Sequence, residues 1–298
     1  MISSHYGEFA ALLTALFWTI TALAFEKATK TVGSIAVNII RLVLGFLFLG
    51  LLTYVQRGMF LPLDATQYAW FWLMLSGFVG LMIGDLFLFA SYPIIGARIA
   101  MLMMTLAPPL AAILGLLILD EKMSSNSIIG MLLVMAGIAM VIWSRPESNK
   151  KMKLNFPIKG LIFAFMGAVG QAGGLVLSKL GMQDYDPFAA TQIRIIAAMF
   201  GFIILISIMG RWKNVLNALK NRNAITNISI GSFFGPFLGV SFSLVAIKYT
   251  STGIASTLMS IVPVLIILPS VVIFKQKVSI KEIIGAVISV IGVSLFFI

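Results

Sequence analysis

The chain has 298 residues, of which 60% are hydrophobic and only 10% are charged, and its mean hydropathy is +1.07. Soluble domains carry about 25% charged residues, so this composition excludes a protein whose whole surface faces water. The net charge of +11 comes from basic residues in short loops, which favours membrane topology over nucleic-acid binding, and the lack of cysteine excludes disulfides and thiolate sites.

Apolar segments follow one another along the whole chain. A membrane-spanning helix needs about 20 mostly apolar residues. Ten segments meet this requirement, at residues 7–29, 34–56, 67–90, 94–119, 125–144, 158–180, 187–209, 224–247, 251–274 and 279–298. The sequence therefore predicts an all-α integral membrane protein with ten transmembrane helices, in the inner or plasma membrane. No basic residue precedes the first segment, so we expect a retained span and not a cleaved signal peptide.

An internal repeat divides the chain. Residues 76–143 align with residues 231–298 without a gap, at an offset of 155, and 16 of the 68 aligned positions are identical. The identical pairs include Gly80/Gly235, Gly84/Gly239, Pro108/Pro263, Gly130/Gly285 and Gly137/Gly292. We interpret residues 1–145 and 158–298 as homologous halves joined by a polar linker at residues 146–157.

Each predicted half has five spans, and this odd number has a consequence. The second half must cross the membrane in the opposite sense to the first. Inverted repeats are typical of secondary transporters, which bind substrate near the bilayer midplane between the repeats. The sequence thus predicts two inverted five-helix repeats around a central cavity. Duplication in a structural membrane protein is the alternative.

Prolines interrupt corresponding segments of the two halves. Pro108 and Pro263 are equivalent in the alignment, and each removes a backbone hydrogen bond and favours a bend. Paired interruptions of this kind indicate the site of a transporter. Small residues at every fourth position, such as Gly80 and Gly84, are more typical of close helix packing.

The stretch SYPIIGARIAMLMMTLAPPLAAILGLLILDEKMSSNSIIGMLLVMAGIAMVI, residues 91–142, resembles the EamA-like family of the drug/metabolite transporter superfamily. The shared features are a tyrosine, a small-residue turn, a proline within a helix, an L-x-E-x end and a glycine-rich fifth helix. The second half repeats this pattern, except that Gln276 stands opposite Glu121. The resemblance implies ten helices in two inverted repeats, alternating access, and export of amino acids or other small metabolites.

Asp85 is the strongest candidate for a functional residue. It is a carboxylate well inside an apolar run, and a charge at the bilayer centre costs on the order of 3 kcal/mol. Its counterpart in the repeat is Val240, so the shared fold does not require the charge. A functional Asp85 would carry a proton or contact the substrate. The structural alternative is a salt bridge to Arg98 or Arg41.

Other polar residues within the predicted spans are also candidates for substrate binding. Arg41 and Arg194 align with each other and lie near Asn38 and Gln192. Each is interpreted as part of a structural or gating ion pair, or as a contact to a substrate carboxylate or phosphate. Trp18 and Gln171 lie near the middle of spans one and six, and the resemblance includes the Trp18 position. Tyr92 is a further candidate. Glu26 and Lys179 lie near helix ends, where snorkelling explains them.

The sequence has no motif for nucleotide binding, metal ligation or catalysis, so we expect a protein that is not an enzyme and has no cofactor. The preferred hypothesis is a secondary transporter that exports amino acids or related metabolites, as a monomer or homodimer, with protons as a candidate coupling ion. A facilitator or exchanger of sugar phosphates or nucleotide-linked sugars, and a scaffold without transport, are the alternatives. Lys and Arg counts of 15 against 4 place the linker in the cytoplasm and both termini outside, whereas the resemblance implies both termini inside.

Overall fold

The computed structural model describes residues 5–143, 157–265 and 280–297, and all regular structure in these residues is helical. The elements are α1 (Tyr6–Val32), α2 (Ser34–Arg57), α3 (Gln67–Ser76), η2 (Gly77–Gly84), α4 (Asp85–Met104), α5 (Ala107–Leu119), α6 (Ser125–Trp143), α7 (Ile158–Met182), α8 (Pro187–Met209), α9 (Trp212–Lys220), α10 (Arg222–Ser232), η3 (Phe233–Gly239), α11 (Val240–Tyr249), α12 (Thr252–Met259), α13 (Val262–Leu265), α15 (Ile280–Ser294) and η4 (Leu295–Phe297). The predicted linker apart from Pro157, and Gln276, lie outside the described residues.

In residues 5–143, 157–265 and 280–297, six helical stretches are long and apolar enough to cross a membrane. They are Tyr6–Val32, Ser34–Arg57, Gln67–Ile95, Ile158–Met182, Pro187–Met209 and Arg222–Tyr249. They correspond to the predicted spans one, two, three, six, seven and eight, so the chain is a multi-pass membrane protein. In the described residues the other four predicted spans are represented by shorter helices, and the number ten stays a prediction.

The predicted boundary between the third and fourth spans is wrong. We expected a turn between residues 90 and 94, but α4 runs through these positions and includes Pro93. Apolar spans tolerate an internal proline where neighbouring groups satisfy the freed backbone atoms. The carbonyl that loses its N–H partner to Pro93 is that of Phe89, and the Ser91 hydroxyl bonds a different carbonyl in the preceding turn, that of Leu88, at 2.6 Å.

The helix interruptions fall at equivalent places in the two halves. In the first half α4 ends at Met104 and α5 begins at Ala107, and in the second half α12 ends at Met259 and α13 begins at Val262. Both differences equal the repeat offset of 155 residues. Pro108 and Pro263 are each the second residue of the following helix, where a missing N–H costs no hydrogen bond.

A second matched feature is a π-helical segment in the middle of each long third span. η2 occupies Gly77–Gly84 and η3 occupies Phe233–Gly239, and both end at the same place in the repeat. A π-helix pairs each N–H with the carbonyl five residues back, which distorts the regular hydrogen-bond ladder. Such segments occur often at functional sites, and these two contribute Leu81 and Pro236 to the cavity described below.

Glycines let η2 and α7 approach until their backbones touch. A Cβ atom on Gly170 would lie 2.5 Å from the Cα of Gly84, and one on Gly174 would lie 2.8 Å from the Cα of Gly80. The two contacts run in opposite directions along the chain, so these segments cross antiparallel. Close backbone packing through small residues is what the glycine spacing predicted.

We expect Gly170→Ala to lower the melting temperature in detergent by several degrees. The added methyl group overpacks a backbone contact, which costs about 1–3 kcal/mol. Gly173→Ala is the matched control, because its methyl group would meet only the Cγ1 of Val79, at 3.4 Å. Equal melting temperatures for the two variants would contradict the packing described here.

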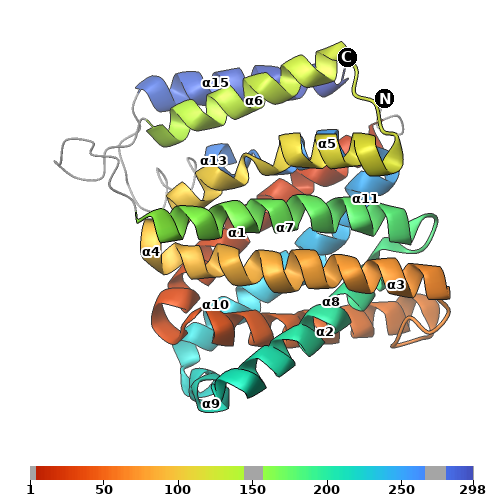
Figure 1. Cartoon of the computed structure of the whole chain (residues 1–298), viewed down its shortest axis with the longest axis vertical. Helices are drawn as coiled ribbons and strands as arrows, with labels where there is room; N and C mark the ends of the chain where they lie inside the picture. Colours follow the sequence, from red (N-terminus) through yellow and green to blue (C-terminus); the bar gives the residue numbers. More distant parts are fainter. Residues whose placement is uncertain (1–4, 144–156, 266–279, 298) are drawn as a thin grey trace.

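Equivalent helices of the two halves also pack antiparallel. A Cβ on Gly130 of α6 would lie 2.8 Å from the Gly292 oxygen of α15, and a Cβ on Gly137 would lie 2.5 Å from the Gly285 oxygen. Gly130 therefore contacts Gly292, the repeat counterpart of Gly137, and Gly137 contacts Gly285, the repeat counterpart of Gly130. A local two-fold axis perpendicular to the two helices produces this exchange. Figure 1 shows α6 and α15 side by side at one edge of the molecule, with α2 and α8 towards the opposite edge.

Candidate functional site

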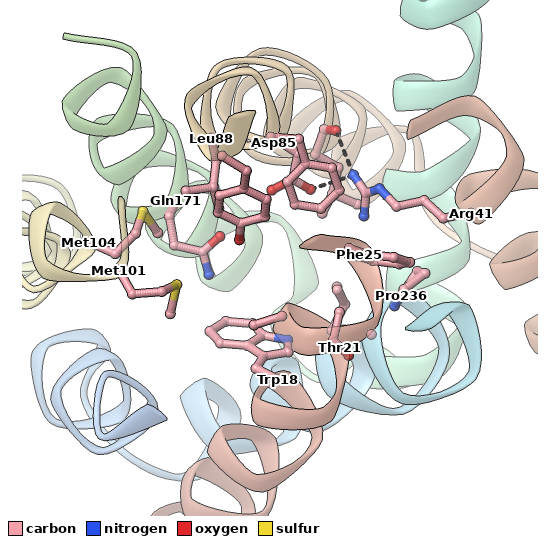
Figure 2. A pocket seen from close by; sticks show the side chains of 16 residues that line it. Trp18, Thr21, Phe25, Arg41, Asp85, Leu88, Met101, Met104, Gln171 and Pro236 are labelled. Carbon is pink, nitrogen blue, oxygen red and sulfur yellow. Dashed lines mark hydrogen bonds and ion pairs between the residues drawn. The ribbon is translucent and has the colours of Figure 1, made fainter. Parts of the chain in front are cut away.

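A cavity lies between helices of both halves. The first half contributes α1, the end of η2 and α4, together with Arg41 from α2, and the second half contributes α7, η3 and the start of α11. Five of the predicted site residues line it: Trp18, Arg41, Asp85, Tyr92 and Gln171. The structure thus gathers, around one space, residues that are up to 153 positions apart in the sequence (Figure 2).

An ion pair forms the most polar part of the cavity wall. The Arg41 Nη2 atom lies 2.5 Å from the Asp85 Oδ2 atom and donates a second hydrogen bond to the carbonyl oxygen of Leu81, at 3.3 Å. The Arg41 side chain is 3% exposed and that of Asp85 is 14% exposed. Of the two partners considered for Asp85, Arg41 lies beside it, and the side chain of Arg98 is outside those that the structure describes.

Asn38 supports this pair from one turn earlier on α2. Its side-chain oxygen accepts a hydrogen bond from the Nε of Arg41, at 3.0 Å, and its side-chain nitrogen donates to the backbone oxygen of Asp85, at 3.4 Å. Asn38 is fully buried and does not line the cavity. Asn38 therefore acts through Arg41: its contacts orient the Arg41 guanidinium without reaching the cavity.

Aromatic rings cover the guanidinium and extend the cavity wall. The Cζ of Arg41 lies 4.9 Å from the ring centre of Phe89 and 5.9 Å from that of Phe25, within the range of cation–π attraction. Tyr92 stacks on Phe89 with ring centres 5.4 Å apart. Phe25 and Phe89 were not among the predicted site residues, because a phenylalanine in an apolar span gives no signal that separates cavity lining from packing.

The rest of the wall is mostly apolar, with the amide of Gln171, the hydroxyl-bearing Thr21 and the indole of Trp18 as its polar residues. Figure 2 shows Arg41 on one side of the cavity and Met101 and Met104 on the other, with Gln171 and Trp18 between them. Methionine side chains adapt to irregular ligands. The arrangement offers one anion, one cation, an amide and a broad apolar surface, which suits a small molecule with both charged and apolar parts.

Gln192 and Arg194 do not line the cavity. The Gln192 amide donates a hydrogen bond to the carbonyl oxygen of Phe60, at 2.7 Å, and so ties α8 to the loop after α2. Arg194 is 4% exposed, its backbone packs on Gly77 and its Nη2 lies close to Gly80. Its Nε atom is buried and has no hydrogen-bond partner within the described part of the chain. The sequence symmetry between Arg41 and Arg194 therefore does not extend to their contacts.

A second ion pair joins the halves at the end of the helices where α1 begins. The Lys179 Nζ, at the end of α7, lies 2.5 Å from the Glu121 Oε1, just after α5, and donates to the carbonyl oxygen of Thr250, at 2.6 Å. The other Glu121 oxygen accepts hydrogen bonds from Thr252, at 2.8 Å from the backbone nitrogen and 2.7 Å from the hydroxyl. Snorkelling was therefore the wrong interpretation of Lys179.

The backbone around Glu121 explains this contact. Asp120 adopts a left-handed conformation, with φ of 54°, and the Glu121 N–H donates to the Gly115 oxygen at 3.1 Å. The chain thus turns back over the last turn of α5. A Cβ on Gly115 would lie 2.4 Å from the Thr252 hydroxyl and 2.8 Å from the Glu121 carboxylate, so only glycine leaves room for both.

Further polar contacts hold the loops at this same end. Arg57 forms an ion pair with Asp64, which also accepts a hydrogen bond from the Tyr185 hydroxyl, at 2.8 Å. Burial raises the pKa of Tyr185 to about 12, so its hydroxyl stays protonated and can donate near neutral pH. Lys248 donates to the backbone oxygens of Asp184 and Tyr185, at 2.9 and 3.3 Å.

Comparisons with known proteins agree with this architecture. The sequence matches the EamA-like transporter family over residues 5–143 and again over residues 158–298. An uncharacterized transporter of Clostridium kluyveri is 25% identical over 175 residues, which are 59% of this chain and 55% of that protein, so the chain spans about half the length of this curated relative. A solved structure, titled only as the crystal structure of a protein, has the same fold, with a TM-score of 0.72 and 18% identity over 99% of this chain and 96% of the other.

Proposed function

Because the chain belongs to the EamA-like transporter family, we propose that it is a secondary transporter of the inner or plasma membrane that works by alternating access. In this proposal ten spans form two inverted five-helix halves, and the substrate binds in the cavity between them. The observation that carries it is the buried Arg41–Asp85 ion pair, which faces a cavity lined by both halves. Charged groups within a membrane are costly, and they persist mostly where they serve transport or pair with each other.

The proposed substrates are amino acids or related small zwitterions, which the protein exports. A zwitterion can replace each partner of the ion pair, with its carboxylate on Arg41 and its ammonium group on Asp85. The exchange leaves neither charge of the protein unpaired, so the cost of opening a buried ion pair is offset. The aromatic and methionine wall favours an apolar or aromatic side chain on the substrate.

The Glu121–Lys179 pair is the proposed barrier at the end of the spans where α1 begins. It links the end of α5 in the first half with the end of α7 in the second, and Thr252 of α12 is bonded to the same carboxylate. The halves cannot separate at this end without breaking these contacts. Substrate binding would shift the balance between closed and open states through its different affinity for each.

Protons are the proposed coupling ion, with Asp85 as their carrier. Protonation of Asp85 would break its ion pair with Arg41 and thereby change the relative stability of the two states. In reconstituted vesicles the native protein should transport at a rate that depends on pH, and Asp85→Asn should be inactive at every pH. Normal transport by Asp85→Asn across the pH range would rule out this role.

A thermal-shift screen tests the proposed substrate class. A ligand that binds the folded protein raises its melting temperature, so a zwitterionic amino acid with an apolar side chain should stabilise the purified protein. Asp85→Asn should abolish this shift, while the matched control Asp64→Asn, outside the cavity, should keep it. If no amino acid raises the melting temperature of the native protein, the substrate class is wrong.

One observation favours a second candidate, a facilitator or exchanger of sugar phosphates or nucleotide-linked sugars. Arg41 and Arg194 are both buried near the carboxylate of Asp85, and among the described residues the Arg194 Nε has no hydrogen-bond partner. A phosphate would supply the missing negative charge and bind arginine in a bidentate manner. Under this alternative a sugar phosphate binds Arg41, which lines the cavity, and stabilises the protein, and Arg41→Lys abolishes the stabilisation.

A further inference from the structure

The short helix α9 connects two candidate spans and lies outside the transport pathway. Gly210, with φ of 63°, ends α8, and α9 covers Trp212–Lys220. Asn221 then begins α10, with its side-chain oxygen accepting a hydrogen bond from the backbone nitrogen of Ala224 at 3.0 Å. Figure 1 shows α9 at one end of the bundle, below α2 and α8. Because α8 and α10 are parts of spans, α9 lies where they leave the bilayer.

The apolar residues of α9 cover two adjacent faces of the helix. Val215 and Ala218 are buried, and they join the core that also contains residues of α2 and α10. Trp212, Leu216 and Leu219 are exposed, at 40%, 56% and 52%. At 3.6 residues per turn these three lie within an arc of about 60°, so they form one exposed apolar strip beside the buried face. The indole N–H of Trp212 donates to the Ser207 hydroxyl at 3.1 Å, which anchors the ring.

Basic residues flank this strip. Arg211, Lys213, Lys220 and Arg222 are all exposed. The sequence contains no Asp or Glu between Asp186 and Glu282, so no carboxylate on α8, α9, α10 or the turns between them compensates these charges. On the helix, Lys213 and Lys220 lie next to Leu216, on the side away from the buried face.

We propose that α9 binds the surface of a bilayer that contains anionic phospholipids. Trp212, Leu216 and Leu219 enter the boundary between headgroups and acyl chains, and the four cations bind headgroup phosphates. An exposed apolar strip alone would accept any lipid, but the cations beside it select negatively charged headgroups. This property goes beyond transport, since α9 contributes nothing to the cavity wall.

The proposal also predicts the orientation of the protein. Anionic lipids give the cytoplasmic leaflet its negative surface potential, so α9 would lie on the cytoplasmic side. The links at the other end of the spans, away from α9, contain four basic residues, Arg57, Lys122, Lys179 and Lys248. These links are held together by the contacts of Glu121 and Tyr185. The end of the spans where α1 begins would then face away from the cytoplasm.

Lipid titration of the purified full chain tests the proposal without measuring transport. The probes are phosphatidylglycerol and phosphatidylcholine in detergent, and the bound lipid is counted by native mass spectrometry. We expect phosphatidylglycerol to bind at least tenfold more tightly than phosphatidylcholine. Because each lysine near an anionic surface contributes about 1 kcal/mol, Lys213→Gln should weaken phosphatidylglycerol binding about fivefold, and Lys213→Gln/Lys220→Gln should weaken it further. Neither change should alter phosphatidylcholine binding.

Lys122→Gln is the matched control, because it removes one exposed lysine at the opposite end of the molecule. It should leave phosphatidylglycerol binding unchanged. Equal binding of the two lipids by the native protein would overturn the proposal. Full retention of phosphatidylglycerol by Lys213→Gln/Lys220→Gln, or an equal loss in Lys122→Gln, would overturn it as well. Both α9 lysines are exposed, and an unchanged melting temperature verifies that the variants are folded.

Discussion

Removing either partner of the Arg41–Asp85 ion pair should destabilise the protein and abolish transport, whereas removing both should restore stability but not transport. The two groups are 2.5 Å apart, and the arginine is 3% exposed. Loss of one partner leaves the other charge buried and uncompensated, which costs about 3–5 kcal/mol. Loss of both removes that penalty, because an apolar pair of similar volume suits the same surroundings.

Three variants make this test: Arg41→Met, Asp85→Leu and the double variant Arg41→Met/Asp85→Leu. Melting temperatures in detergent report stability, and substrate counterflow in reconstituted vesicles reports transport. The double variant should melt near the native temperature and transport at least about a hundredfold more slowly, because a bound zwitterion would lose two charged hydrogen bonds of about 1.5–3 kcal/mol each.

The surface pair of Arg57 and Asp64 provides the matched control. It joins the same two residue types, but Asp64 is exposed and neither residue lines the cavity. Arg57→Met/Asp64→Leu should therefore transport nearly as fast as the native protein. If Arg41→Met/Asp85→Leu is stable and also transports normally, the ion pair is structural and the proposed substrate site is wrong.

The sequence predicted those features that depend on local pattern or on the repeat. Runs of apolar residues identified the six long spans, since hydropathy decides which segments can enter a bilayer. The alignment of Pro108 with Pro263 identified the two places where helices are interrupted. Asp85 and Arg41 were candidates because a charge in an apolar run is costly, and five of the eight predicted binding residues line one cavity.

Features that depend on packing between distant segments were beyond the sequence pattern. No signal marks η2 as π-helical, because glycines at every fourth position also suit an ordinary packed α-helix. Lys179 lies near a helix end, where the sequence predicted a side chain extended towards water at the membrane surface. Its partner Glu121 is 58 residues earlier, and the contact depends on the left-handed turn at Asp120, a residue type that tolerates this conformation without requiring it.

The two ends of the molecule are unequal at the level of sequence. The repeat alignment places Gln276 opposite Glu121, and the offset of 153 residues that relates Arg41 to Arg194 places Glu26 opposite Lys179. An amide and a carboxylate cannot reproduce the ion pair that Glu121 and Lys179 form. Glu26 instead pairs with Lys30 on its own helix, at 2.7 Å and with 57% of the lysine exposed. Breaking the Glu121–Lys179 pair should therefore affect one end of the transporter only.

We expect Lys179→Met to open the end of the spans where α1 begins. With the lysine gone, Glu121 is unpaired in the closed state but hydrated in the open state, so the balance shifts towards opening.

The chain has no cysteine, and Ala15→Cys therefore introduces a single thiol without background. Ala15 is fully buried, on α1 between the cavity residue Trp18 and this end. A membrane-impermeant thiol reagent applied at this end should label Ala15→Cys/Lys179→Met at least tenfold faster than Ala15→Cys, a shift of about 1.4 kcal/mol or more.

Glu121→Gln should have the same effect, since it removes the other charge of the pair. Glu26→Gln is its matched control, because it makes the same chemical change at the opposite end of the spans, at the position that the repeat places opposite Lys179, where the carboxylate pairs with the exposed Lys30. Ala15→Cys/Glu26→Gln should be labelled at the rate of Ala15→Cys alone. If Lys179→Met and Glu121→Gln leave the labelling rate unchanged, the ion pair stabilises the fold without closing the transport pathway. Acceleration by Glu26→Gln to the same degree would also contradict the barrier, because both ends would then respond to any loss of charge.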